Sequence, residues 1–195
     1  KVKKIGIGVP ELINNQGIIR GSYNFKWNNK KLGNYFPKKF NTRVDSDVRN
    51  HLRAEKYFGY GKVSKNFIYI NIGTGLSYSH YKDNKIYTGS NGFAIHFASS
   101  KITLYNPKNN QKISLVPEDL YSGKSIMKYL KKYNNKKKLS YLTNISESLA
   151  SLIGNLVNSV DPHMIVLGGG VVVNNKVFRN LLINYIRKYI FSNDV

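Results

Sequence analysis

The sequence predicts a two-lobed α/β protein, because strand and helix patterns are mixed along its 195 residues. Residues 66–72 alternate isoleucine with tyrosine and asparagine, which is typical of a buried strand, and a glycine turn follows at once. Apolar residues between 144 and 160 recur at helical spacing. A second strand pattern at 164–167 runs into three consecutive glycines. This length is enough for two small lobes with a sizeable core.

The N-terminal third is predicted to contain one strand and one clear helix. Residues 5–9 carry the strand pattern, whereas residues 10–34 are rich in asparagine, glycine and charge, which indicates loops and short strands. Asp45 or Ser46 can cap a helix that runs to Phe58.

A boundary between two lobes is expected at 61–65, where glycine and lysine precede a new buried strand. Residues 1–63 are therefore predicted to be the remainder of a small N-terminal lobe, and residues 64–195 a large C-terminal lobe. The last helix is a candidate to pack back on the small lobe.

The middle of the chain is predicted to form an antiparallel group of strands at 66–72, 76–82 and 85–88. Asp83 and Asn84 provide its hairpin turn. A polar loop is expected at 106–111.

Three helices are expected in the C-terminal half. Ser122 can cap the first, whose inward residues are Ile126, Met127 and Leu130. Asn144 and Glu147 resemble a capping box at the start of the second, which ends near Val160. The last helix is amphipathic, and its apolar residues are Val177, Leu181, Leu182, Tyr185, Ile186 and Tyr189.

Composition excludes several classes of protein. The chain has no cysteine, so it has neither disulfides nor a zinc site built from thiolates, which suits a cytoplasmic protein. No apolar run approaches the roughly 20 residues that a membrane-spanning helix needs. No signal peptide is expected, because the first apolar run is short and contains Pro10.

The net charge of +21 has two interpretations. A basic surface favours an anionic partner such as a nucleic acid, and it would also attract an anionic substrate such as ATP. Alternatively, the abundance of lysine, asparagine, isoleucine and tyrosine reflects AT-rich coding. The one dense cluster is predicted to be a solvated loop or helix end, and consists of Lys131, Lys132, Lys136, Lys137 and Lys138.

Three segments occur in the order and spacing of the ROK family, named for repressors, open reading frames and kinases. They are V-D-S-D-V-R-N-H-L-R-A-E at 44–55, G-T-G at 73–75 and D-P-H-M-I-V-L-G-G-G-V at 161–171. The segments 5–10 and 87–92 also resemble that family, so the resemblance covers nearly the whole chain.

The resemblance implies a ribonuclease-H-like, actin-type ATPase fold with a cleft between two lobes. It implies ATP and Mg²⁺ as cofactors, with the nucleotide held by Gly73, Thr74, Gly75, Ser122, Gly123, Gly168, Gly169 and Gly170. Glycines let a phosphate or base lie against the backbone. Both glycine turns have an alternative interpretation as tight turns without a ligand.

Asp47 matches the family aspartate that accepts a proton from the attacking sugar hydroxyl. The alternative is that Asp47 simply caps the following helix. The resemblance also implies substrate-binding roles for Asn24, Ser46, Asn91, Gly92 and His96. Asparagine suits hydroxyl recognition because its amide both donates and accepts hydrogen bonds. Asn24 is equally well interpreted as a turn residue, and His96 as a partly buried histidine without a ligand.

The chain departs from the family pattern in several places. The N-terminal phosphate loop, an aspartate followed by two glycines and threonine, is absent, so we expect a longer protein whose N-terminal part precedes this chain. Ser46 replaces an asparagine, His96 a sugar-binding glutamate and Ser99 a histidine that binds sugar and zinc. The cysteine-rich zinc site is also absent, so no structural zinc is expected.

Three functions therefore remain open. The first is ATP-dependent phosphoryl transfer to a sugar or sugar-like hydroxyl, with altered sugar specificity. The second is a non-catalytic sensor, transcriptional regulator or pseudokinase. A kinase-like subunit of a hetero-oligomer is a third possibility. The family implies a homodimer, and a nucleic-acid partner only where a DNA-binding region lies upstream.

Overall fold

The computed structural model describes residues 2–21 and 25–192. Contacts divide the chain into two compact units. Unit 1 contains residues 1–69 and 78–95, and unit 2 contains residues 70–77 and 96–195. The sequence-based lobe boundary near residue 63 stays a prediction.

A parallel strand pair organises unit 1. Strand β1 (Lys4–Val9) pairs with β2 (Asn41–Ser46), in register from Lys4 opposite Asn41 to Val9 opposite Ser46. Helix α1 (Asp47–Phe58) follows β2 without a connecting loop. Short 3-10 turns lie at Leu32–Tyr35 (η1) and Tyr60–Val63 (η2). The core beside the strands consists of Val9, Ile13 and Ile19, with Ile7, Trp27, Leu32 and Val44 packed against it.

A four-stranded sheet has the order β5-β4-β3-β8. Its strands are β3 (Phe67–Ile72), β4 (Leu76–Lys82), β5 (Lys85–Tyr87) and β8 (Ile165–Gly168). The predicted hairpin is confirmed, because β4 and β5 are antiparallel and both Asp83 and Asn84 have positive φ angles. The division between the units passes through β3 and β4, so both strands contribute residues to each unit.

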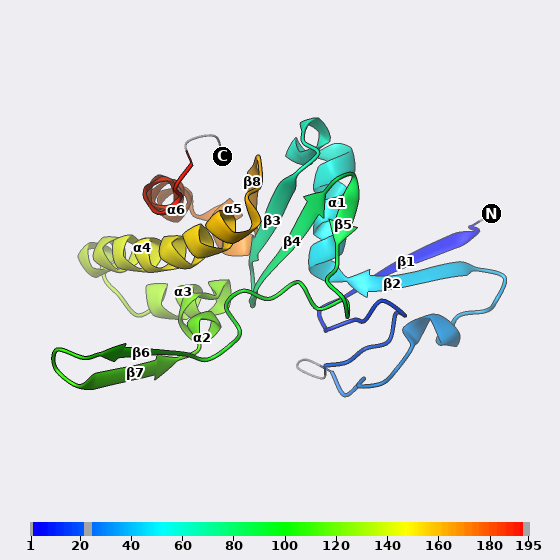
Figure 1. The fold of residues 1–195 in the computed structure, drawn as a ribbon, viewed down its shortest axis with the longest axis horizontal. Helices are drawn as coiled ribbons and strands as arrows, with labels where there is room; N and C mark the ends of the chain where they lie inside the picture. The colour runs from blue at the N-terminus through cyan, green and yellow to red at the C-terminus, as the bar shows by residue number, and fades with distance from the viewer. Residues whose placement is uncertain (1, 22–24, 193–195) are drawn as a thin grey trace. The chain divides into compact units, whose positions relative to one another are not determined.

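Helices dominate unit 2, and its longest two, α4 (Asn135–Val160) and α6 (Lys176–Tyr189), lie side by side (Figure 1). Gly154 permits this approach, because a Cβ there would lie 2.6 Å from the Cβ of Tyr189. The shorter helices are α2 (Pro117–Tyr121), α3 (Gly123–Leu130) and α5 (Gly170–Asn174). No helix among the described residues is long and apolar enough to span a membrane.

The predicted start of the long helix was wrong. The capping residue is Asn134, whose side chain accepts the N–H of Lys137, and not Asn144. Lys136, Lys137 and Lys138 lie in the first turn of α4, so of the two alternatives expected for the lysine cluster, a loop or a helix end, the structure shows a helix end for these three.

Ser122 does cap α3 as predicted, through a bond from Ser125 N–H. Met127 was wrongly placed inside, since it is 45% exposed.

The hairpin of β6 (Ile102–Asn106) and β7 (Gln111–Leu115) was missed, although its polar connection was expected. Leu104 lies opposite Ile113 on this hairpin, yet both side chains are more than half exposed. The strands therefore lack the alternation of buried and exposed residues on which strand prediction depends.

The pH dependence of stability provides a test of unit 1. His80 on β4 is 3% exposed, and its Nε2 lies 2.7 Å from Asn66 Oδ1. Burial, reinforced by the charge of Lys82, lowers the pKa of His80 below its usual 6.5, and Asp83 opposes this shift. Below pH 6.5 the unfolded chain therefore binds a proton that the folded chain resists, so the free energy of unfolding decreases as pH falls.

We expect the urea concentration at the midpoint of unfolding to decrease when the pH is lowered from 7.5 to 5.5. In His80→Gln this decrease should be smaller. Fluorescence of Trp27, the single tryptophan, reports unfolding of unit 1 because Trp27 packs on its core. His51→Gln, at an exposed position of α1, is the control. An unchanged pH dependence in His80→Gln would contradict the assignment.

Candidate functional site

The junction of β2 and α1 presents the predicted catalytic residue. Asp47 is the first residue of α1 and is partly exposed, and its Oδ1 accepts the N–H of Val48 at 2.7 Å. Oδ2 has no hydrogen-bond partner among the described residues. Burial, together with the charges of Glu55 and Asp47, raises the pKa of Tyr69, so the Tyr69 hydroxyl keeps its proton near this carboxylate.

Ser46 occupies the N-cap position, but its side chain makes no capping bond. The Ser46 residue is completely buried, and its Oγ has no hydrogen-bond partner among the described residues. Its role in substrate binding stays a prediction. Asp45, the other candidate cap, lies at the end of β2 and accepts the N–H of Ser46.

Two arginines of α1 hold the carboxylate of Asp45. Arg49 donates from Nε to Oδ1 at 2.6 Å, and Arg53 donates from Nη2 to Oδ2 at 2.5 Å. Their environments differ, because the side chain of Arg49 is 2% exposed and that of Arg53 is 41% exposed. Arg49 is therefore a buried cation whose charge Asp45 compensates.

The remaining nitrogens of Arg49 join two segments that are distant in sequence. Nη1 donates to the carbonyl of Gly92 at 3.0 Å, and Nη2 to the carbonyl of Ile13 at 3.3 Å. Gly92 has a φ of +85°, and a Cβ there would lie 2.7 Å from the Ile13 carbonyl oxygen. This close approach brings the 89–93 loop against a hairpin of residues 12–20, whose two sides meet in an antiparallel bridge between Ile13 and Ile19.

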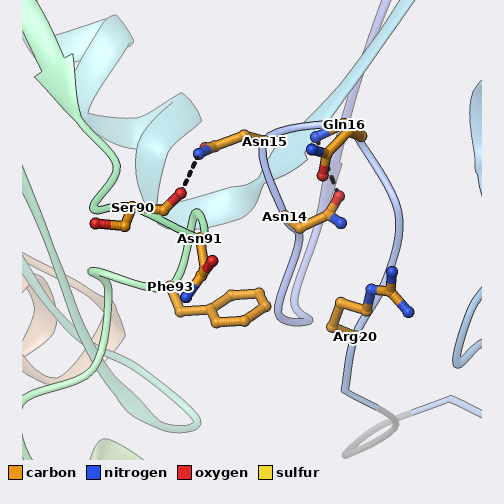
Figure 2. A pocket seen from close by; sticks show the side chains of 7 residues that line it. All are labelled: Asn14, Asn15, Gln16, Arg20, Ser90, Asn91 and Phe93. Carbon is orange, nitrogen blue, oxygen red and sulfur yellow. Dashed lines mark hydrogen bonds between the residues drawn. The ribbon is translucent and has the colours of Figure 1, made fainter.

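A pocket of about 300 Å³ lies where this hairpin and loop meet (Figure 2). At its rim, Asn15 Nδ2 donates to the carbonyl of Ser90 at 2.9 Å. Asn14 Oδ1 accepts the N–H groups of Gln16 and Ile18, which closes the hairpin turn. The lining residues are Asn14, Asn15, Gln16, Arg20, Ser90, Asn91 and Phe93.

Of these lining residues, sequence reasoning identified only Asn91. The asparagines of the hairpin were interpreted only as a sign of loops and short strands, because nothing in their spacing indicates that they face the 89–93 loop. A second hollow, of about 630 Å³, lies against β1 and β2 and shares Asn15 and Gln16 with the pocket.

In unit 2, the predicted nucleotide-binding segments meet at the end of β3. Gly73 follows β3 directly. A Cβ on Gly123 would lie 2.7 Å from the Gly73 carbonyl oxygen, and a Cβ on Gly169 would lie 2.3 Å from the Ile72 carbonyl oxygen. The structure therefore brings together three segments that in the sequence were linked only by their resemblance to the family pattern. It also shows that Gly123 and Gly169 are required by packing of the chain itself.

Glu118 braces the 73–75 turn. Its Oε1 accepts the N–H of Leu76 at 2.6 Å, and a Cβ on Gly75 would lie 2.4 Å from this oxygen. Its Oε2 accepts the hydroxyl of Ser99 at 2.7 Å. Because that hydroxyl proton is used, His96 Nδ1 must donate to Ser99 Oγ, 3.0 Å away.

The predicted substrate residues fall in different units. Asn91 and Gly92 belong to unit 1, and His96 belongs to unit 2. Asn24 lies outside the described residues. In the described part of the chain, no three His, Asp or Glu side chains come together in a way that could hold a metal ion.

The model of the ROK family matches residues 1–110 and 108–194. The chain belongs to the ROK family. A xylose repressor of Caldicellulosiruptor bescii is 29% identical over 198 residues, which cover 84% of this chain and 49% of the repressor. A glucokinase of Thermotoga maritima is 22% identical over 201 residues, covering 86% of this chain and 63% of the enzyme. The chain thus spans about half the length of the ROK repressors it matches.

Solved ROK structures show the same fold. A ROK glucokinase from Streptomyces griseus, in complex with glucose and AMPPNP, matches with a TM-score of 0.79 and 16% identity over 98% of this chain and 73% of the glucokinase. A ROK transcriptional regulator homologous to the E. coli MLC protein matches with a TM-score of 0.80 and 19% identity, over 98% of this chain and 56% of the regulator. The expected actin-type ATPase fold is confirmed.

Removing Arg49 should loosen the pocket walls. Arg49→Met leaves the carbonyls of Gly92 and Ile13 buried without their donor, so we expect a loss of about 3 kcal/mol in the free energy of unfolding. Urea unfolding followed by Trp27 fluorescence measures this loss. Arg53→Met is the matched control, because it removes the exposed partner of Asp45 and should cost less than about 1 kcal/mol. Equal losses in the two variants would contradict the bridging role of Arg49.

Proposed function

We propose that the chain forms part of an ATP-dependent ROK kinase that transfers a phosphoryl group to a hydroxyl of a sugar or sugar-like substrate. The observation that carries this proposal is Asp47, which stands at the start of α1 with one carboxylate oxygen held by Val48 and the other unbonded among the described residues. A carboxylate so held has one oxygen oriented to accept the proton of an attacking hydroxyl.

The 73–75 turn, Gly123 and the 168–170 turn would hold the nucleotide. Gly170 suits this role, because a Cβ there would meet nothing within 4 Å, and Thr74 is exposed. Bound Mg²⁺ would neutralise phosphate charge during the transfer. The expectations of a homodimer and a cytoplasmic location stay predictions.

A second candidate function is a sugar sensor or transcriptional regulator. It is supported by the xylose repressors among the relatives and by the structural match to a regulator. Ser46, His96 and Ser99 each replace a residue of the sugar-kinase pattern, as expected of a member that kept the fold and lost the kinase's grip on its sugar. A DNA-binding region upstream in the full-length protein would favour this alternative.

Phosphoryl transfer tests the kinase directly. The full-length protein with Mg-ATP should phosphorylate at least one member of a panel of hexoses, N-acetylhexosamines and amino sugars. We expect Asp47→Asn to reduce kcat by about 100-fold or more with little change in KM, because the base acts in the transition state. Asp83→Asn, in the hairpin turn, is the control. Transfer that survives in Asp47→Asn would exclude the role of Asp47, and no transfer by a folded protein would favour the sensor.

Glu118 provides a separate test of the nucleotide site. Glu118→Ala releases both the Leu76 N–H and the Ser99 hydroxyl, so the 73–75 turn should lose its brace. We expect affinity for AMPPNP, measured by calorimetry, to fall about tenfold, because the turn loses the charged hydrogen bond between Glu118 and the Leu76 N–H. Asp119→Ala makes the same charge change at the exposed neighbouring position and should leave affinity unchanged. Equal effects of the two variants would contradict a local role for Glu118.

A further inference from the structure

The charge of the unit 1 pocket restricts the ligand that it can bind. Arg20 is the single ionisable residue among its seven lining residues. The other polar residues are neutral amides and one hydroxyl, which donate to and accept from sugar hydroxyls. Glu11, the acidic residue in the neighbouring sequence, is 3% exposed, accepts the N–H of Phe25 and does not line the pocket.

The backbone and side chain of Arg20 are both held in place. Its N–H donates to the Leu12 carbonyl at 2.7 Å across the hairpin, and its Nη1 donates to Asn29 Oδ1 at 2.8 Å. Asn29 has a φ of +61°, a conformation that asparagine tolerates better than most residues, and its N–H donates to the Ile19 carbonyl. A guanidinium oriented by such a hydrogen bond loses less conformational entropy when it binds a ligand than one without a partner.

Phe93 supplies an apolar surface from the other wall. Phe93 and Arg20 line the same pocket, Phe93 from the 89–93 loop and Arg20 from the hairpin (Figure 2). Phe93 is 37% exposed, so part of the ring remains available for contact. A sugar ring has an apolar face that an aromatic ring can cover, while its hydroxyls meet the amides of Asn14, Asn15 and Asn91.

We propose that this pocket binds a monosaccharide that carries an anionic group, a carboxylate or a phosphate, and that Arg20 pairs with that group. The proposal rests on the proposed carbohydrate function and adds the substrate class. A guanidinium binds either anion through two parallel hydrogen bonds, and no lining carboxylate repels it. The net charge of +21 increases the local concentration of anionic ligands further.

Calorimetry on the full-length protein without nucleotide tests this proposal, with glucuronate, glucose 6-phosphate, glucose and glucosamine as ligands. We expect glucuronate or glucose 6-phosphate to bind about tenfold or more tightly than glucose, and glucosamine to bind most weakly. Whichever anionic sugar binds more tightly identifies the group as a carboxylate or a phosphate. The preference should shrink as salt is raised, because the guanidinium is exposed.

Arg20→Gln should weaken binding of the anionic sugar about 10- to 100-fold and leave glucose unchanged. Arg20→Lys keeps the charge without the paired geometry, so its affinity for the anionic sugar should lie between those of the wild type and Arg20→Gln. Phe93→Ala should weaken all four sugars alike. Arg187→Gln, an exposed change of the same kind in unit 2, is the matched control and should have no effect.

Three outcomes would each overturn the proposal. In the first, glucose binds as tightly as both glucuronate and glucose 6-phosphate. In the second, Arg20→Gln retains the preference for the anionic sugar, and in the third, no anionic sugar binds. These outcomes are separable from failure of the kinase proposal. Phosphorylation of a neutral sugar without anionic preference overturns the ligand class alone. Anionic-sugar binding without phosphoryl transfer supports the ligand class and favours a sensor.

Discussion

The buried guanidinium of Arg49 is the interaction on which the organisation of unit 1 depends. A buried cation is costly unless it is paired and fully hydrogen-bonded, and Asp45 together with the carbonyls of Ile13 and Gly92 meets both conditions. The same bonds connect the end of β2 to the hairpin and the loop that enclose the pocket. The compensation of one charge therefore helps to hold the two pocket walls together.

Unit 2 uses close backbone approach for the same purpose. At the end of β3, carbonyl oxygens of Ile72 and Gly73 leave no room for a Cβ on Gly169 or Gly123. Glu118 then holds the 73–75 turn through Leu76 and connects it to Ser99. Where the family pattern has a histidine that binds zinc, this chain therefore has a serine in a hydrogen-bonded chain that runs from a carboxylate to His96.

The sequence predicted those parts of the site that are continuous along the chain. The β2–α1 junction and the turn after β3 are each carried by a few neighbouring residues, so Asp47 and Gly73 could be found from local pattern and family resemblance. The Arg49 bridge could not, because its acceptors are backbone carbonyls 36 and 43 positions away, and every residue has a carbonyl. Arg20 was missed for a related reason, since its partner Asn29 is one of many asparagines in a segment that reads as loop.

The glycines weigh less in the choice between kinase and sensor than their sequence pattern indicates. Gly123 and Gly169 are both required by contacts with the backbone of Ile72 and Gly73, so a ligand sensor with this fold would need them as much as a kinase. Asp47 differs, because its second carboxylate oxygen makes no hydrogen bond within the described structure. Either protein could use that carboxylate to accept a hydrogen bond from a sugar hydroxyl, but only a kinase needs it for proton transfer. The comparison of Asp47→Asn with wild type therefore bears on function more directly than any change at a glycine turn.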